Sequence, residues 1–194
     1  MKTRMLVEIG VMSVLVFLFD LLSHLLPIPG TTEGITLYMI PIFLISFKYG
    51  VKAGLLTGIT SSLIFLIFGH FHSFTWPQYI LDYIIALGVL SIAGVYSKNI
   101  RSCGCNCEQR SSYIVKGVFF GVLLKAIVNF TSVLIFINEY FEHGHSHVYE
   151  SLLETGEVFF ALVYTMLAIV PSAVITAIIL VRSFKKYGNK IIGL

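Results

Sequence analysis

The chain has 194 residues, of which 57% are hydrophobic and 12% are charged, and its formal net charge is +3. A soluble domain carries roughly twice that share of charged residues, so the composition excludes an ordinary soluble protein and favours the lipid bilayer as solvent. The small positive charge requires no nucleic acid, because anionic lipid headgroups and cytoplasmic partners are sufficient counterparts.

A membrane-spanning helix needs about 20 mostly apolar residues. In chain order, the apolar runs predict one all-α integral membrane domain over residues 1–194, with six transmembrane helices at about 5–26, 35–50, 53–70, 77–97, 113–137 and 157–182. The second and third runs are short and meet at "KYGVKAG", so fewer spans with one re-entrant hairpin is the alternative. The first run is interrupted by Glu8 and Asp20 and lacks a cleavage site, which favours a retained helix over a signal peptide.

The basic residues are very unevenly distributed over this topology. Twelve of the thirteen Lys and Arg residues fall on one side, and Lys125 alone lies within a span. The opposite loops contain several Glu residues and no Lys or Arg. By the positive-inside rule, both termini are expected to be cytoplasmic.

Motifs for metal binding and catalysis are weak. The three cysteines of "CGCNCEQ" lack the usual C-x2–4-C zinc spacing, and we interpret them as part of a polar loop. The histidines of "EHGHSHVYE" could bind metal weakly, but a hydrated external loop is the simpler interpretation. No nucleotide-binding G-x-x-x-x-G-K-[ST] motif and no catalytic arrangement is present, so we expect neither an enzyme nor a resident cofactor.

Four ionisable side chains fall inside predicted spans: Glu8, Asp20, Asp82 and Lys125. A charge at the bilayer centre costs about 2.5–3.5 kcal/mol on insertion scales, so it usually faces a bundle interior or a water-filled cavity. Glu8 lies one turn from the expected cytoplasmic end and is interpreted as structural. Asp20 has His24 four residues later, within reach on the same helix face.

Asp82 lies one turn after Gln78, and Tyr79 and Tyr83 flank this polar stripe. A carboxylate with an amide and aromatic walls suits a small cationic or polar heteroaromatic ligand.

Lys125 is followed at i+4 by Asn129, which again places two polar groups on one helix face. Two interpretations stay open. Lys125 either forms an ion pair with Asp82 or contributes to the same ligand cavity.

Several segments together resemble a known family: "MLVEIGVMSVLVFLF", "MIPIFLISFKYGVKAGLLTGI", "GHFHSFTWPQYILDYIIALGVLSIAG" and "GVLLKAIVNF". They resemble, in order and spacing, the thiamine-specific S-component of energy-coupling-factor (ECF) transporters, and "FFALVYTMLAIVPSAVI" fits more loosely. The resemblance implies a six-helix protein of the bacterial plasma membrane that captures a vitamin from outside with high affinity. It also implies docking on a transmembrane coupling subunit with two cytoplasmic ATPase subunits, which drive uptake.

The resemblance places the family's acidic–aromatic pair on Asp82 and Tyr83. Other pocket positions carry different residue types here: a histidine position falls on Asn129, a Tyr and an Asn of span six fall on Phe160 and Thr165, and an aromatic of the third loop falls on His72. Thiamine is therefore the expected ligand, with a pyridoxine-type vitamin or a thiamine precursor as the alternative.

In this family, small residues on span one allow the partner helix to approach closely. The matching positions are Gly10 and Val14, with Ser13 nearby, and ordinary internal packing is the alternative. The loop Pro27–Gly34 is expected to act as a lid over an outward-facing pocket. An autonomous ion-coupled carrier, with Asp82 or Asp20 as the coupling site, is the competing class of function.

Overall fold

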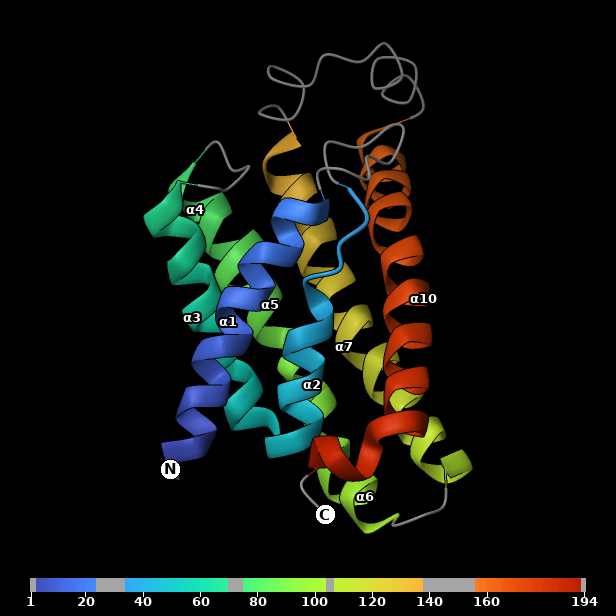
Figure 1. Ribbon diagram of the computed structural model, residues 1–194. Helices are drawn as coiled ribbons and strands as arrows, with labels where there is room; N and C mark the ends of the chain where they lie inside the picture. Colours follow the sequence, from blue (N-terminus) through green and yellow to red (C-terminus); the bar gives the residue numbers. More distant parts are fainter. Residues whose placement is uncertain (1–2, 24–33, 70–74, 104–106, 138–155, 193–194) are drawn as a thin grey trace.

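The computed structural model describes residues 3–23, 34–69, 75–103, 107–137 and 156–192, and the regular elements within these ranges are helical. They are α1 (Thr3–Ser23), α2 (Met39–Tyr49), α3 (Val51–Phe68), α4 (Trp76–Tyr79), η1 (Ile80–Ile85), α5 (Ala86–Val89), η2 (Leu90–Tyr96), α6 (Ser97–Ser102), α7 (Cys107–Ile135) and α10 (Glu157–Ile192). The run from α4 to α6 is continuous and is called span four below. The helices pack side by side as a bundle (Figure 1).

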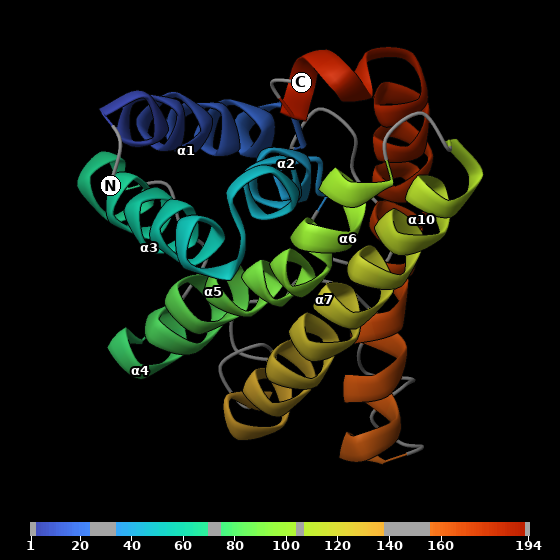
Figure 2. The same cartoon turned by 90° about the horizontal axis from the view of Figure 1, so that it is seen from below.

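Five helices in the described part of the chain are long and apolar enough to cross a membrane: α1, α3, span four, α7 and α10. The predicted span at 35–50 is instead the 11-residue α2, which is shorter than a crossing normally requires. Eight of its residues are buried, and it packs against α1, α3, η2 and α10. In Figure 2, α2 lies among these helices. The prediction of six crossings therefore depends on this short core helix.

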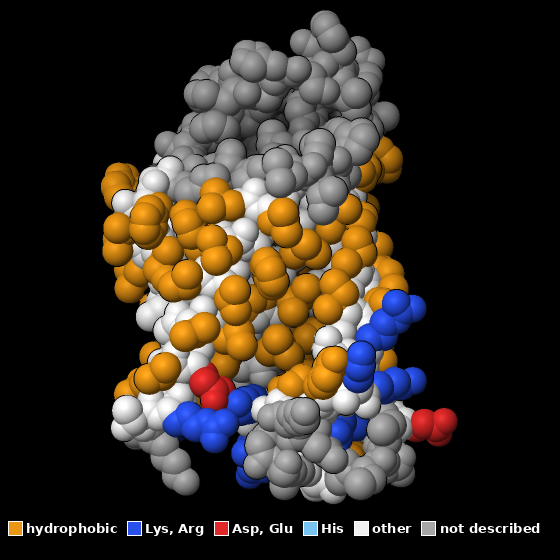
Figure 3. All heavy atoms as spheres, viewed as in Figure 1, with side chains coloured by type: hydrophobic (Ala, Val, Ile, Leu, Met, Phe, Trp, Pro, Cys, Tyr) orange, Lys and Arg blue, Asp and Glu red, His pale blue; other side chains and the backbone are white. Residues whose placement is uncertain are grey.

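Both chain ends lie at the same end of the bundle (Figure 1). In Figure 3 an apolar band covers the middle of the molecule, and the Lys and Arg side chains gather towards the end that carries the termini. This segregation of charge is the pattern from which the cytoplasmic placement of both termini was predicted.

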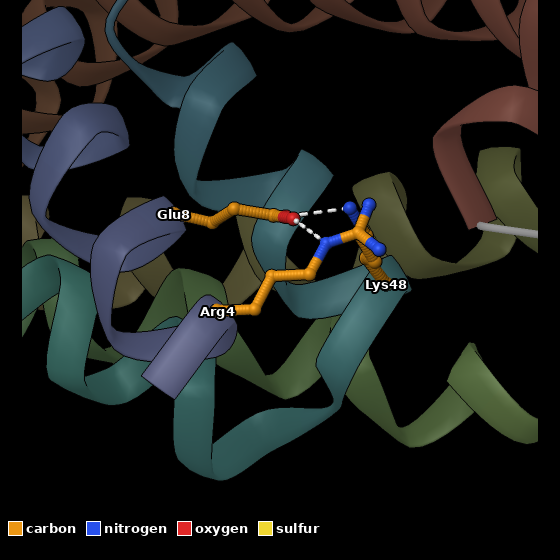
Figure 4. A network of polar contacts seen from close by, with 3 residues as sticks. All are labelled: Arg4, Glu8 and Lys48. Atoms are coloured by element: carbon orange, nitrogen blue, oxygen red, sulfur yellow. Dashed lines mark hydrogen bonds and ion pairs between the residues drawn. The ribbon is translucent and has the colours of Figure 1, made fainter. Parts of the chain in front are cut away.

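An ionic network ties α1 to α2 at this basic end (Figure 4). Arg4 Nε donates to Glu8 Oε1 at 3.1 Å, and Lys48 Nζ lies 2.5 Å from Glu8 Oε2. Glu8 and the Lys48 side chain are partly buried, whereas Arg4 is exposed. The Glu8 carboxylate is therefore held between two cations from neighbouring helices.

Gly50 forms the whole connection between α2 and α3. Its φ of +92° is a conformation that residues with a Cβ rarely adopt, and its N–H donates to Ser46 O at 2.8 Å. The chain reverses within this residue, so that α3 starts directly beside α2.

The antiparallel approach of α3 and span four is very close. A Cβ added to Gly94 of span four would lie 2.4 Å from the backbone nitrogen of Val51, and one added to Gly58 would lie 2.9 Å from Leu87 O. Helices approach this closely only where side chains are absent or small. Small residues recur at every fourth position from the start of α3 onward. We call them the small-residue ladder: Gly50, Gly54, Gly58 and Ser62.

Two glycines bring α7 against the other side of span four. A Cβ on Gly117 would lie 3.3 Å from Ala93 O, and one on Gly121 would lie 3.2 Å from Leu90 O. The same added atoms would clash with the rings of Phe47 and Phe43 from α2. α2, span four and α7 therefore interlock around these two phenylalanines, which are fully buried.

We expect Gly94→Ala to destabilise the protein by about 1–3 kcal/mol, the usual cost of overpacking, because its Cβ would meet backbone that cannot rotate away. Thermal unfolding in detergent measures this effect. Gly10→Ala is the matched control, since an added Cβ there meets no atom within 4 Å. Equal unfolding temperatures for the two variants would contradict this view of the helix contact.

Candidate functional site

Span four winds as a π-helix over Ile80–Ile85, the stretch that contains Asp82 and Tyr83. Both residues are half-buried, whereas Gln78 and Tyr79 before the π-turn and Ala86 after it are buried. π-turns are rare and occur frequently at functional sites. A half-buried carboxylate inside a membrane span is stable only beside polar groups or water.

An aromatic wall stands beside Asp82. The rings of Tyr79 and Tyr83 stack with centroids 5.1 Å apart and planes inclined by 14°, and Phe65 of α3 meets Tyr83 edge-on at 5.4 Å. The Tyr79 hydroxyl donates to the backbone oxygen of Ser62. The two tyrosines that flank the predicted polar stripe are therefore held against α3.

On the other side of the site, α7 and α10 pack as an antiparallel pair. Ala126 of α7 shares a buried cluster with Ala168 of α10, and Val133 shares a second cluster with Ala161. This register places Asn129 and Thr165, which lie midway between these two contacts, at the same height on facing helices.

Three polar atoms in this layer have no hydrogen-bond partner among the described residues: Asn129 Oδ1, Ser132 Oγ and Thr165 Oγ1. Ser132 is 0% exposed and Thr165 is 2% exposed. Buried polar groups in proteins are nearly always paired, so a group of unpaired ones calls for a water molecule or a ligand. Sequence reasoning missed Ser132, although its spacing of three residues from Asn129 puts it on the same helix side.

Asp82 of span four lies at the height of this layer. The contacts of Gly117 with Ala93 and of Gly121 with Leu90 fix the register of α7 against span four. Continued by two turns, this register brings Asn129 to the height of Asp82, and η1 is in contact with α7. Three helices thus contribute to one polar layer.

Lys125 lies one turn from Asn129 on α7 and is 1% exposed. Its Nζ lies 5.6 Å from the ring centroid of Tyr38, which immediately precedes α2. The cation is thus placed next to an aromatic face, an arrangement that stabilises a desolvated ammonium group. The ion pair between Lys125 and Asp82 stays a prediction.

Backbone hydrogen bonds hold the segment before α2 in place. The N–H of Thr36 donates to Ser172 Oγ of α10 at 2.9 Å, and the N–H of Leu37 donates to Ser23 Oγ of α1 at 3.4 Å. This fixes the entry into α2, next to Tyr38. Most of the predicted lid, Pro27 to Glu33, lies outside the described residues.

Phe160 lies above the polar layer on α10. It is 1% exposed and stacks with Tyr164 at 5.9 Å, within a cluster completed by α7 residues. Tyr164 is a second aromatic that the sequence interpretation did not select, although it follows Phe160 by one turn. His72 and the histidine-rich tract lie outside the described residues.

The predicted docking positions on α1 differ in exposure. Gly10 and Val14 are exposed, and Val14 is 49% exposed. Ser13 is buried and contacts α3, with its Oγ 2.9 Å from Thr60 Oγ1 and 3.4 Å from Thr57 O. The docking surface proposed for this helix therefore consists of Gly10 and Val14, while Ser13 serves internal packing.

Comparisons with known proteins agree with each other. The family model described as Thiamine transporter protein (Thia_YuaJ) matches residues 6–191. The chain is 30% identical over 181 residues to the thiamine transporter ThiT of Bacillus subtilis (strain 168), covering 92% of this chain and 89% of that protein. A solved structure of ThiT from Listeria monocytogenes matches with a TM-score of 0.80 and 19% sequence identity, covering 98% of this chain and 99% of that one. The last match shows a shared all-helical fold.

We predict that Asp82 and Lys125 are energetically coupled. Asp82→Asn and Lys125→Met should each destabilise the ligand-free protein, because each leaves a buried charge without its counterpart. The double variant should lose less than the sum of the two, by a coupling free energy of about 0.5–3 kcal/mol. Denaturant unfolding in detergent measures all four proteins of this cycle. Strictly additive losses would refute the pair and assign Lys125 to the ligand.

Proposed function

The chain belongs to the thiamine transporter protein family, and from this we propose that it is the substrate-binding S-component of an ECF-type importer. It is a multi-pass protein of the cell membrane and a transporter rather than an enzyme. In the proposed role, it captures thiamine with high affinity from outside the cell and releases it inward.

The observation that carries this proposal is the polar layer of Asp82, Asn129 and Thr165 between aromatic side chains. Thiamine combines a positively charged thiazolium ring with an aminopyrimidine ring. The carboxylate of Asp82 complements the cation, and the rings of Tyr79 and Tyr83 offer faces for cation–π contact and stacking.

The α7 and α10 side of the layer complements the aminopyrimidine. Asn129, Ser132 and Thr165 supply amide and hydroxyl groups whose oxygen atoms have no partner in the described residues. Hydrogen bonds from a ligand would satisfy them and at the same time fix its orientation. In this proposal the buried side chains of Lys125, Gln78 and Phe160 complete the surroundings of the ligand.

Uptake driven by ATP requires an ATPase, and the sequence of this chain has no nucleotide-binding motif. A transmembrane coupling subunit with two cytoplasmic ATPase subunits would supply it. The exposed Gly10 leaves space on α1 for a close helix–helix approach.

We expect calorimetric titration of the detergent-purified chain with thiamine to show tight binding, and Asp82→Asn to weaken it about 10- to 100-fold, the loss of a hydrogen bond to a charged group. Pyridoxine, pyridoxal and the isolated aminopyrimidine serve as comparison ligands. Tighter binding of one of these would mean that the scaffold has changed its specificity. Unchanged affinity of Asp82→Asn would remove the carboxylate from the site.

Thr165→Val should weaken thiamine binding about 3- to 10-fold without lowering the stability of the ligand-free protein, because the lost hydroxyl has no protein partner in the described residues. Thr176→Val is the matched control. Thr176 is also buried on α10 with an unpartnered Oγ1, but it lies well beyond the polar layer. A similar loss of affinity in both variants would contradict the assignment of Thr165.

Reconstituted liposomes separate the ECF mechanism from an autonomous carrier. We expect thiamine uptake only when the coupling subunit, the two ATPases and ATP are present. Gly10→Leu should then reduce uptake but not binding, because it fills the space available to the partner helix. Uptake by the chain alone, driven by a proton or sodium gradient, would establish the competing class.

A further inference from the structure

The π-turn that contains Asp82 and Tyr83 has a hydrogen-bond contact with α3 that the function described so far does not use. Ser62 of α3 is 1% exposed, and its Oγ lies 3.0 Å from the backbone oxygen of Tyr83 and 2.9 Å from that of Gly58. The backbone oxygen of Ser62 in turn accepts the hydroxyl of Tyr79. Ser62 thus contacts span four at two positions, Tyr79 just before the π-turn and Tyr83 within it.

The contact matters because a π-turn disrupts the hydrogen bonding of an α-helix. Inside η1 the N–H of Ala86 is directed to Leu81 O, five residues back, and also to Tyr83 O. The α-helical pattern of i to i−4 bonds is therefore lost at this point. A hydroxyl that reaches Tyr83 O from another helix gives that carbonyl a partner in the π-helical winding.

The small-residue ladder explains how the Ser62 hydroxyl reaches the backbone oxygen of Tyr83 on the neighbouring helix. Gly58 contacts Leu87 O, and Ser62, one turn further along α3, meets Tyr83, one turn earlier in span four. A side chain at position 58 would meet the Leu87 carbonyl and push the helices apart. A residue with no hydroxyl at position 62 would leave the Tyr83 carbonyl without this bond.

We propose that Ser62 is a positioning residue of the binding site: through Tyr83 O it holds the π-turn that directs Asp82 and Tyr83 together towards the ligand. This rests on the proposed function for the ligand, but the effect on the π-turn does not require any ligand. If the turn relaxed to α-helix, the helix faces before and after it would rotate relative to each other by about 100°, one residue of an α-helix.

The test compares two neighbouring serines. Ser61 and Ser62 are both buried on α3, and each hydroxyl lies within hydrogen-bond distance of the carbonyl oxygen four residues back, but in the described part of the chain only Ser62 also reaches span four. Ser62→Ala should weaken thiamine binding about 5- to 30-fold. Ser61→Ala should leave the affinity unchanged, and Ser62→Thr, which keeps the hydroxyl, should restore most of it.

Two further readouts separate positioning from general loss of stability. The affinity losses of Ser62→Ala and Asp82→Asn should be less than additive, because a displaced carboxylate contributes less. A structure of ligand-free Ser62→Ala should show Ile80–Ile85 wound as α-helix. Equal effects of the two serine variants, or a π-turn that persists in Ser62→Ala, would overturn the proposal.

The experiments distinguish a failure of the proposed thiamine binding from a failure of the positioning role of Ser62. If the unmodified protein does not bind thiamine, the proposed function fails, whereas the winding of Ile80–Ile85 in ligand-free Ser62→Ala still decides the role of Ser62. If the unmodified protein binds thiamine and Ser62→Ala binds it equally well, only the positioning role fails.

Discussion

The close contact between α3 and span four is the constraint on which the rest of the structure depends. In a bilayer no hydrophobic force drives helices together, so packing and interhelical hydrogen bonds must do so. The small-residue ladder provides both: its glycines allow backbone contact near Leu87, and Ser62 adds a hydrogen bond at Tyr83. With span four fixed in this way, α2 fits against it with its phenylalanines, and α7 closes the other side.

This packing also explains why a costly carboxylate can be kept within the membrane. Asp82 lies in the one described π-helical segment, at a height where α7 and α10 present Asn129 and Thr165. Among the described residues, this layer gathers three unpartnered polar side chains: Asn129, Ser132 and Thr165. Unpaired polar groups of this kind are typical of a binding site and not of a stable apolar core, because they gain hydrogen-bond partners only when the ligand binds.

The sequence was sufficient for the membrane class, the helical fold and the family, because apolar length and motif spacing are local properties. It also selected Asp82, Tyr83 and Asn129, since a polar residue in an apolar span is conspicuous. It did not reveal that α2 is a short buried helix, because an apolar run shows no difference between a lipid-facing and a protein-facing surface. The ladder in "KYGVKAGLLTGITSS" is a visible spacing of small residues, but the sequence does not say which helix lies opposite it, and the π-turn has no sequence signal of its own.

The central claim is that a cationic vitamin binds in the polar layer between span four, α7 and α10. A structure of the chain determined after incubation with thiamine tests this most directly. The account predicts ligand density between Asp82, Asn129 and Thr165, with an aromatic ring of the ligand against Tyr83. Density for the ligand elsewhere, with this layer occupied only by water, would contradict it.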